Sequence, residues 1–331
     1  MSVSKVFIRL MVRGHIRGES TNSGRAMRTL AGTLVFLLSA LPAAGADRHK
    51  DVEKIGERDI NKGSWNLYSI EREIKLGREL AARVESSSHI LRDRRVQSFV
   101  DDQVQNLVRH SDAGLPFTVK VIDSDEVNAF ALPGGFLYVN TGLILEAETE
   151  AELAGILAHE IAHVTARHAT KQATKASLFQ WLTMPLIFIG GPAGYGIQQA
   201  IGLAGPLTFL KFKRGAEREA DVLGLQYTYH AGYDPVALID ILERLKDAER
   251  ENRLAAVFST HPMTRDRIQR AQKGIEEMLP PRPEYVVSTS RFAQVKAHLR
   301  RLQEANRLYE PQQGRGPRLR RRTQESKRAQ P

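Results

Sequence analysis

One short segment, His159-Glu160-Ile161-Ala162-His163, limits what this chain can fold into more than any other feature of its sequence. Residues four apart in an α-helix lie on the same face, so both imidazoles can reach one zinc ion. Glu160 stands beside them, placed to take a proton from the attacking water. The chain has 10 His in 331 residues. Such a pattern then arises by chance in on the order of 2% of chains. The segment predicts a zinc site on a helix, with His159 and His163 as ligands and Glu160 as the catalytic base.

The residues around this segment predict a buried helix over 149–170. Thr149 and Glu152 have the spacing of a capping box, which marks a helix start. An apolar stripe follows at helical spacing, made of Leu153, Leu157, Ile161 and Val164. The alternative is a charged helix edge that carries two solvated histidines. Such apolar surroundings do not favour it.

A catalytic zinc needs a third protein ligand and an open position. A histidine six residues after His163 would fall at Ala169, so that arrangement is absent. His168 is turned by roughly 140° from His163 on a continuous helix, and we expect an ordinary surface histidine there. Glu217 and Asp221 stand four residues apart on another predicted helix. One of these carboxylates can bind the metal while the other accepts the free N–H of a ligating histidine.

Charge and composition exclude several classes of protein. The chain carries 48 Lys+Arg against 38 Asp+Glu, a net charge of +10. Residues 1–30 account for +5 and residues 315–328 for +6, so the part between them is close to neutral. No aromatic residue interleaves the arginines of the C-terminal tail, which disfavours nucleic acid and favours anionic lipid headgroups as its partner. The absence of cysteine excludes disulfides and thiolate metal sites.

The N-terminal region has the pattern of a secretory signal. Residues 30–41 are uncharged, Arg25 and Arg28 precede them, and Ala44-Gly45-Ala46 follows. We expect translation to start at Met27, with residues 1–26 an upstream extension, 27–46 the signal peptide and Asp47 the first mature residue. A permanent anchor needs about 20 apolar residues, which this stretch lacks. The mature protein is therefore expected in the periplasm.

The remaining pattern predicts an α+β fold that is mostly helical. Two amphipathic helices are expected within 71–108, and short strands at 117–122, 127–132 and 136–139 form a small antiparallel sheet. Further helices are expected at 141–147, 215–230, 235–250 and 264–278. A helical extension at 284–310 and a disordered basic tail at 311–331 follow the main domain, 47–283.

These motifs resemble, in order, those of the zinc metallopeptidase family that includes the CAAX prenyl protease, HtpX and BepA. The matching segments are residues 128–135 with Tyr138 and Val139, 157–163, 217–221, 231–235 and 259–262 with Arg267. The resemblance implies a gluzincin-type fold, one zinc ion per chain, Glu217 as third ligand and Asp221 against a ligating histidine. It also implies that His261 lies near the metal, where it can fill the open position and hold the enzyme latent. The strand beside the active site would contain Asn128, Ala129, Phe130 and Ala131.

Residues 176–210 depart from this family because they carry no charge and yet contain Pro185, Gly190 and Pro206. These breaks leave neither half long enough to span a membrane. The segment is a flap over the active site, a surface that contacts a membrane, or ordinary core. Only about 50 residues follow the matched region, too few for the helical repeats that BepA-like proteins carry.

The sequence thus predicts an exported zinc endopeptidase that acts on misfolded or unassembled envelope proteins. An extended substrate would pair with the edge of the 128–132 strand. The alternative is a zinc-bound chaperone or binding module for outer-membrane protein assembly, with little turnover.

Overall fold

The computed structural model describes residues 52–187, 212–248, 261 and 265–313. Several predictions fall outside these residues. They are the upstream extension, the signal peptide, the start of the mature chain, the second half of the uncharged segment and the tail beyond residue 313. They stay predictions.

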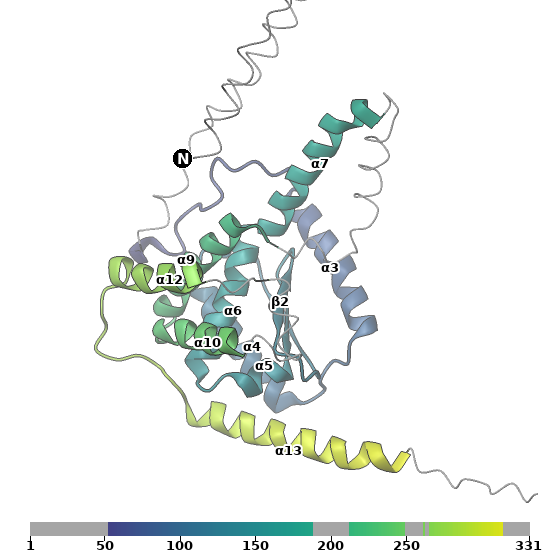
Figure 1. Cartoon of the computed structure of the whole chain (residues 1–331), viewed down its shortest axis with the longest axis vertical. Coiled ribbons are helices and arrows are strands. Elements are labelled where there is room, and N and C mark those ends of the chain that lie inside the picture. Colours follow the sequence, from purple (N-terminus) through teal and green to yellow (C-terminus); the bar gives the residue numbers. More distant parts are fainter. Residues whose placement is uncertain (1–51, 188–211, 249–260, 262–264, 314–331) are drawn as a thin grey trace, which may run out of the picture. The chain divides into compact units, whose positions relative to one another are not determined.

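Helices dominate the described part of the chain (Figure 1), so the expected mostly helical α+β fold is confirmed. The elements follow in the order η1 (Val52–Lys54), α3 (Ile70–Ser87), α4 (Arg94–Arg109), β1 (Thr118–Ile122), β2 (Ala129–Leu132), β3 (Phe136–Asn140), α5 (Thr141–Glu146), α6 (Glu150–Thr165), α7 (His168–Ile187), α9 (Arg214–His230), α10 (Val236–Asp247), α12 (Arg265–Met278) and α13 (Ser290–Gln313).

The small sheet is mixed, whereas the sequence predicted an antiparallel one. Its strand order is β1-β3-β2. β2 pairs with β3 antiparallel, through a turn in which Gly134 and Gly135 adopt φ angles of 77° and 87°. β1 pairs with β3 in parallel, with Val119 opposite Leu137. Short apolar runs indicate strands but not their direction, because alternation is the same in both kinds of ladder. β2 is consequently an edge strand of the sheet that the described residues form.

Helix α6 lies at the centre of the fold and packs against α4, α9, α10 and β2 (Figure 1). Thr149 Oγ1 accepts a hydrogen bond from the N–H of Glu152 (3.1 Å), as a capping box requires. The Glu152 carboxylate accepts instead from the N–H of Glu148 (2.6 Å), one residue before the cap. Every residue of α6 is buried. Its polar side chains must therefore find partners inside the protein.

A turn at Arg167 ends α6, so the single helix predicted over 149–170 is two helices. Arg167 has a φ of 55°, a conformation that non-glycine residues rarely adopt. Its guanidinium donates to Glu73 Oε2 (2.7 Å) and to the carbonyl of Tyr68 (2.6 Å), which holds the turn in place. The chain restarts as α7, which runs into the first part of the uncharged segment.

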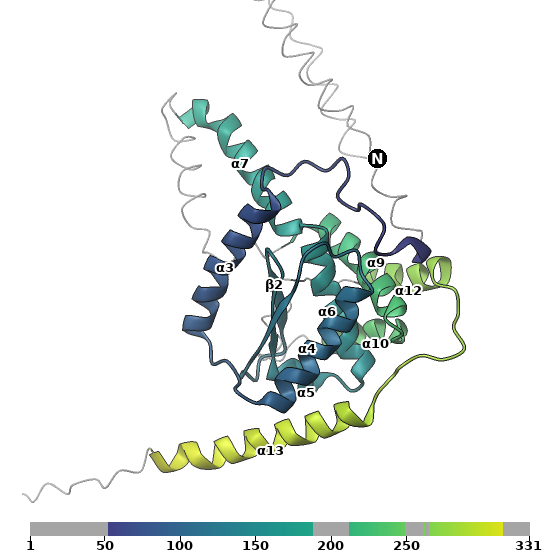
Figure 2. The same ribbon diagram turned by 180° about the vertical axis from the view of Figure 1, so that it is seen from behind.

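The C-terminal helix α13 packs against α4 and α5 (Figures 1 and 2). Its contact face is apolar, with Phe292, Val295 and Leu299 almost fully buried. The ring of Phe292 lies 5.7 Å from that of Phe99. Among the residues that the structure describes, no helix has the length and apolar character needed to cross a bilayer.

Candidate metal centre and active site

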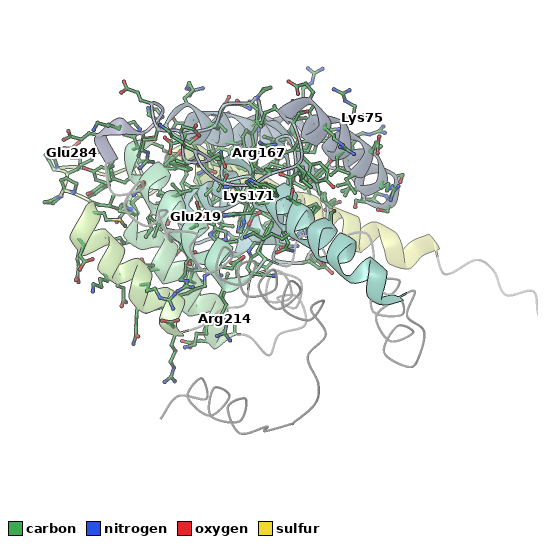
Figure 3. All side chains as sticks on the ribbon, turned by 90° about the horizontal axis from the view of Figure 1, so that it is seen from above. Lys75, Arg167, Lys171, Arg214, Glu219 and Glu284 are labelled. Carbon is green, nitrogen blue, oxygen red and sulfur yellow. The ribbon has the colours of Figure 1, made fainter. Side chains whose placement is uncertain are left out.

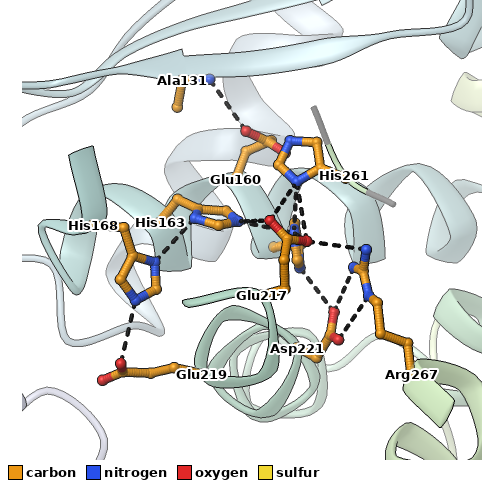
Figure 4. A network of polar contacts seen from close by, with 10 residues as sticks. Ala131, Glu160, His163, His168, Glu217, Glu219, Asp221, His261 and Arg267 are labelled. Atoms are coloured by element: carbon orange, nitrogen blue, oxygen red, sulfur yellow. Dashed lines mark hydrogen bonds and ion pairs between the residues drawn. The ribbon is translucent and has the colours of Figure 1, made fainter. Parts of the chain in front are cut away.

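Four buried side chains bring nitrogen and oxygen ligand atoms together at one place (Figure 4). They are His159 and His163 of α6, Glu217 of α9, and His261, and their candidate ligand atoms all lie within 4.8 Å of one another. His159 Nε2 lies 3.0 Å from His163 Nε2. Glu217 Oε1 lies 3.5 Å from His163 Nε2, and Glu217 Oε2 lies 3.6 Å from His159 Nε2. The two histidines of the HExxH segment and Glu217 therefore share one small site.

The close packing of α9 against α6 makes this convergence possible. Gly224 of α9 faces the backbone of α6, and a Cβ there would lie 3.1 Å from both Cα and N of His159. A larger side chain would push the helices apart. Because Glu217 and Gly224 lie seven residues apart, they share one face of α9. The close contact between α9 and α6, which requires a glycine at position 224, thus places Glu217 beside the two histidines.

Asp221 and Arg267 support the cluster from its far side (Figure 4). Asp221 Oδ1 lies 3.1 Å from His159 Nδ1, the ring nitrogen that points away from the cluster. Arg267 donates to Asp221 through Nε (2.8 Å) and Nη2 (2.7 Å), and its Nη1 lies 3.0 Å from Glu217 Oε2. All three groups are buried. This geometry orients His159 with Nε2 towards the cluster, as a ligating ring requires.

Glu160 lies on the opposite side of the cluster, towards the sheet. Its Oε2 accepts a hydrogen bond from the N–H of Ala131 (3.2 Å) in the edge strand β2, and its Oε1 lies 3.3 Å from His261 Nε2. The other nitrogen of His261, Nδ1, lies 3.0 Å from Glu217 Oε1. The carboxylate of Glu160 therefore faces both the metal-binding atoms and the strand at which a peptide could pair.

The predicted substrate strand is β2 with the residue before it. The carbonyl of Asn128 accepts from the N–H of Asn140, while Ala129 and Ala131 lie opposite Val139 and Leu137 of β3. The ring of Phe130 stacks on Tyr138, with centroids 5.2 Å apart. Among the residues that the structure describes, β3 pairs with one edge of β2. The other edge lies beside Glu160 at Ala131.

The sequence prediction for His168 was wrong. His168 is buried, at 5% exposure, and its Nδ1 lies 2.9 Å from Nδ1 of His163. Its Nε2 lies 3.3 Å from Glu219 Oε2. The prediction assumed a continuous helix, whereas the turn at Arg167 points the side chain back at His163. Phe212 was also missed: its ring stacks on that of His163, with centroids 4.0 Å apart.

Burial and neighbouring charges set the pKa values of these groups. Burial opposes the charged form of His159, but Asp221 and Glu217 outweigh it and raise the pKa of His159 to about 9. Burial, with the repulsion of the neighbouring rings, lowers the pKa of His163 well below its usual value. Burial raises the pKa of Glu160. Although burial opposes it, contact with His159 and His261 holds the pKa of Glu217 below its usual range.

The donor set fits zinc. Imidazole nitrogens and a carboxylate oxygen are its usual protein ligands other than thiolate, and this chain has no cysteine. Ring nitrogens that point at one another across 3.0 Å inside a protein are well accounted for by a shared cation. The cluster can therefore hold one metal ion.

Residues 91–275 match the model of Peptidase family M48. The chain belongs to this family. The match contains α6, α9 and all four candidate ligands, and it confirms the resemblance found in the sequence. The prediction of a metalloprotease is confirmed with it.

Several known proteins are similar to this chain. The beta-barrel assembly-enhancing protease of Escherichia coli (strain K12) is 28% identical over 252 residues, 72% of this chain and 50% of that protein. The putative beta-barrel assembly-enhancing protease of Vibrio cholerae is 30% identical over 273 residues, 78% of this chain and 56% of that protein. The mitochondrial metalloendopeptidase OMA1 of Schizosaccharomyces pombe is 36% identical over 175 residues, which are 50% of this chain and 48% of that protein. The chain spans about half the length of these relatives.

Proposed function

We propose that this chain is a zinc-dependent endopeptidase of the cell envelope that degrades misfolded or unassembled envelope proteins. The observation that carries the proposal is the arrangement of Glu160. It lies between a cluster of metal-binding atoms and the N–H of Ala131 on an edge strand. A base, a metal site and a peptide-pairing edge in one place suit hydrolysis of an extended chain.

His159, His163 and Glu217 would hold one zinc ion, which when bound polarises the scissile carbonyl and makes water more acidic. Glu160 takes the proton of the attacking water at one carboxylate oxygen and delivers it to the leaving amine. A pKa raised by burial suits both halves of this transfer, because the group must accept a proton and then release it. The N–H of Ala131 holds the other oxygen of Glu160 in position.

Backbone pairing at β2 would bind the substrate. An extended peptide that lies along Asn128, Ala129, Phe130 and Ala131 would exchange main-chain hydrogen bonds with those groups of the strand that β3 and Glu160 leave free. These bonds do not depend on the side chains of the peptide. This mode suits unfolded proteins of varied sequence. Relatives named beta-barrel assembly-enhancing proteases support envelope proteins as substrates, since β-barrels are typical of outer membranes.

The signal pattern at 27–46 supports export, with Asp47 first in a mature metallopeptidase domain that ends near residue 283. The periplasm is the proposed location. The basic tail and the uncharged segment 176–210 support peripheral contact with a membrane.

The second candidate function is a zinc-bound chaperone with little turnover. The position of His261 favours it. This ring contacts Glu160 and Glu217 at once, within 3.3 Å and 3.0 Å, so it competes with water and substrate for the site.

Metal analysis and casein digestion distinguish the endopeptidase from the chaperone. Both measurements compare the wild-type protein with Glu160→Gln. The endopeptidase proposal expects equal zinc content and a loss of proteolysis by about 10²–10⁴-fold, the usual contribution of a general base. Wild-type protein that binds zinc but cleaves no faster than Glu160→Gln would favour the chaperone.

A further inference from the structure

Two side chains outside the predicted site, those of His168 and Glu219, extend its contacts towards the protein surface. His163 Nδ1, the ring nitrogen that points away from the cluster, lies 2.9 Å from His168 Nδ1. His168 Nε2 lies 3.3 Å from Glu219 Oε2. Figure 4 shows this chain of contacts running from the cluster through His168 to Glu219. His168 is 5% exposed, whereas the Glu219 side chain is 29% exposed. A buried ligand is thereby connected to a carboxylate that reaches solvent.

The backbone turn between α6 and α7 creates this contact. On a continuous helix, His168 would point roughly 140° away from His163. Arg167, at a φ of 55°, ends α6 and lets α7 begin at His168 in a new direction. Glu73, itself buried, accepts from Arg167 Nε (2.7 Å) and from Thr170 Oγ1 (3.1 Å), which fixes both sides of the turn. The unusual conformation is thus held by specific bonds.

Each ring can adopt only one protonation pattern that satisfies all of these contacts. His163 Nε2 faces the cluster and must offer a lone pair to a metal, so its proton is on Nδ1. That N–H donates to Nδ1 of His168, which accepts. His168 then carries its proton on Nε2 and donates it to Glu219. The carboxylate at the end of the chain is the acceptor that sets the direction of every bond in it.

We infer that His168 and Glu219 are positioning residues that orient His163 for metal binding. This inference rests on the proposed metal site. A ligating histidine usually donates its second N–H to a carboxylate, a carbonyl or water, and loss of that partner weakens metal binding by about 10–100-fold. Asp221 contacts His159 directly in this way. His163 reaches its carboxylate through a second imidazole.

The surroundings leave His163 few other ways to stay oriented. Phe212 stacks on its ring with an interplanar angle of 17°, which restricts tilting of the ring about Cβ–Cγ but allows two orientations related by a flip of about 180°. The contact of Nδ1 with His168 selects the orientation in which Nε2 faces the cluster. Figure 3 shows Arg167, Lys171 and Glu219 near one another, and Lys171 interacts with the charge of Glu219. His168 contacts this carboxylate directly, and the charge of Lys171 attracts it.

The test compares zinc affinity, measured by competition with a chelator, in four variants. His168→Leu removes the acceptor and is expected to weaken zinc binding by about 10–100-fold. In His168→Asn the side-chain oxygen stands where Nδ1 stood, one bond beyond Cγ, so binding is expected to stay close to wild type. Glu219→Ala shortens a side chain that is 29% exposed and is expected to weaken binding by a smaller factor. His230→Leu, at the far end of α9, is the matched control and should change nothing.

A cobalt-substituted sample gives a readout besides affinity, since its visible absorption reports the geometry of the ligands. His168→Leu should shift or weaken these bands, and His168→Asn should restore them. If His168→Leu binds zinc like wild type, or if His168→Leu and His168→Asn are equally impaired, the inference is overturned. If His168→Leu fails to fold, Glu219→Ala decides, and unchanged affinity in that variant overturns the inference. Failure of the proposed metal site is distinguishable, because wild type itself would then bind no zinc.

Discussion

The two nitrogens of His261 contact Glu160 and Glu217 at the same time. Nε2 lies 3.3 Å from Glu160 Oε1, and Nδ1 lies 3.0 Å from Glu217 Oε1. One imidazole therefore occupies the space between the proposed base and the proposed third ligand. Water and a scissile carbonyl would need this same space.

Removal of this ring should activate the enzyme. We predict that His261→Ala cleaves casein faster than wild type and cleaves itself. Each 1.4 kcal/mol by which the ring-bound state is favoured lowers the active fraction by about tenfold, so the measured increase in rate reports how strongly His261 holds the site closed. The measurement is initial rate and band pattern on a gel at matched zinc content. An inactive variant with full zinc content would make His261 a catalytic contact instead of a latch.

The two carboxylates on α9 should behave differently when they are changed. Glu217→Ala removes a proposed ligand and is expected to lose zinc. Asp221→Asn keeps the shape and weakens the contacts with His159 Nδ1 and with Arg267, so affinity should fall by about 10–100-fold. Zinc content after gel filtration and chelator competition give the two values. Equal zinc content in Glu217→Ala and wild type would place the third ligand elsewhere.

Zinc binding should strengthen with pH between about 6.5 and 9. Despite its burial, His159 has a pKa raised from 6.5 to about 9 by Asp221 and Glu217, and zinc must displace that proton. Affinity should therefore rise by about tenfold per pH unit in this window and level off above it. The sign is opposite for the stability of the metal-free protein. There the protonated ring contributes fully below pH 6.5, and its contribution is lost as the pH rises through 9.

Chelator competition from pH 6 to pH 10, corrected for the chelator's own protonation, measures this dependence. Urea unfolding of the metal-free protein over the same range measures the opposite trend. Asp221→Asn is the control, because loss of the partner carboxylate should move the window to lower pH. A zinc affinity that does not change between pH 6.5 and 9 would contradict the assignment of the proton to His159.

Helical spacing accounts for the parts of the site that the sequence could predict. His159 with His163, and Glu217 with Asp221, are pairs four residues apart, and each pair does face one place. Helical spacing gave a wrong prediction for His168, because α6 ends before that residue. Arg167 carries no turn signal such as glycine or asparagine, and its conformation depends on Glu73, more than 90 residues away in the sequence. His168 could not be placed without that distant contact.

The same limit applies to the sheet. The alternation in 117–122 indicated a strand, but its parallel pairing with β3 depends on how the chain packs between them. The residues of α6 predicted a buried helix, and the structure confirms this, since every residue of α6 is buried. The alanines and Gly155 of this helix allow neighbours to approach closely.

The close approach of α9 to α6 gives a prediction about stability and metal binding together. Gly224→Val should destabilise the protein by on the order of 1–3 kcal/mol, the usual cost of overpacking. The reason is that a Cβ at this position already meets Cα and N of His159 at 3.1 Å, and backbone atoms of a buried helix cannot move aside as a side chain can. Displacement of α9 should also draw Glu217 away from the histidines and weaken zinc binding.

Gly215→Ala is the matched control on the same helix, because an added Cβ there meets no atom within 4 Å. It should leave zinc affinity unchanged and keep or raise stability, since alanine favours a helix by up to about 1 kcal/mol over glycine. Urea unfolding and chelator competition on both variants check the pair. If Gly224→Val matches Gly215→Ala in both measurements, the contact between α9 and α6 at His159 does not set the position of Glu217.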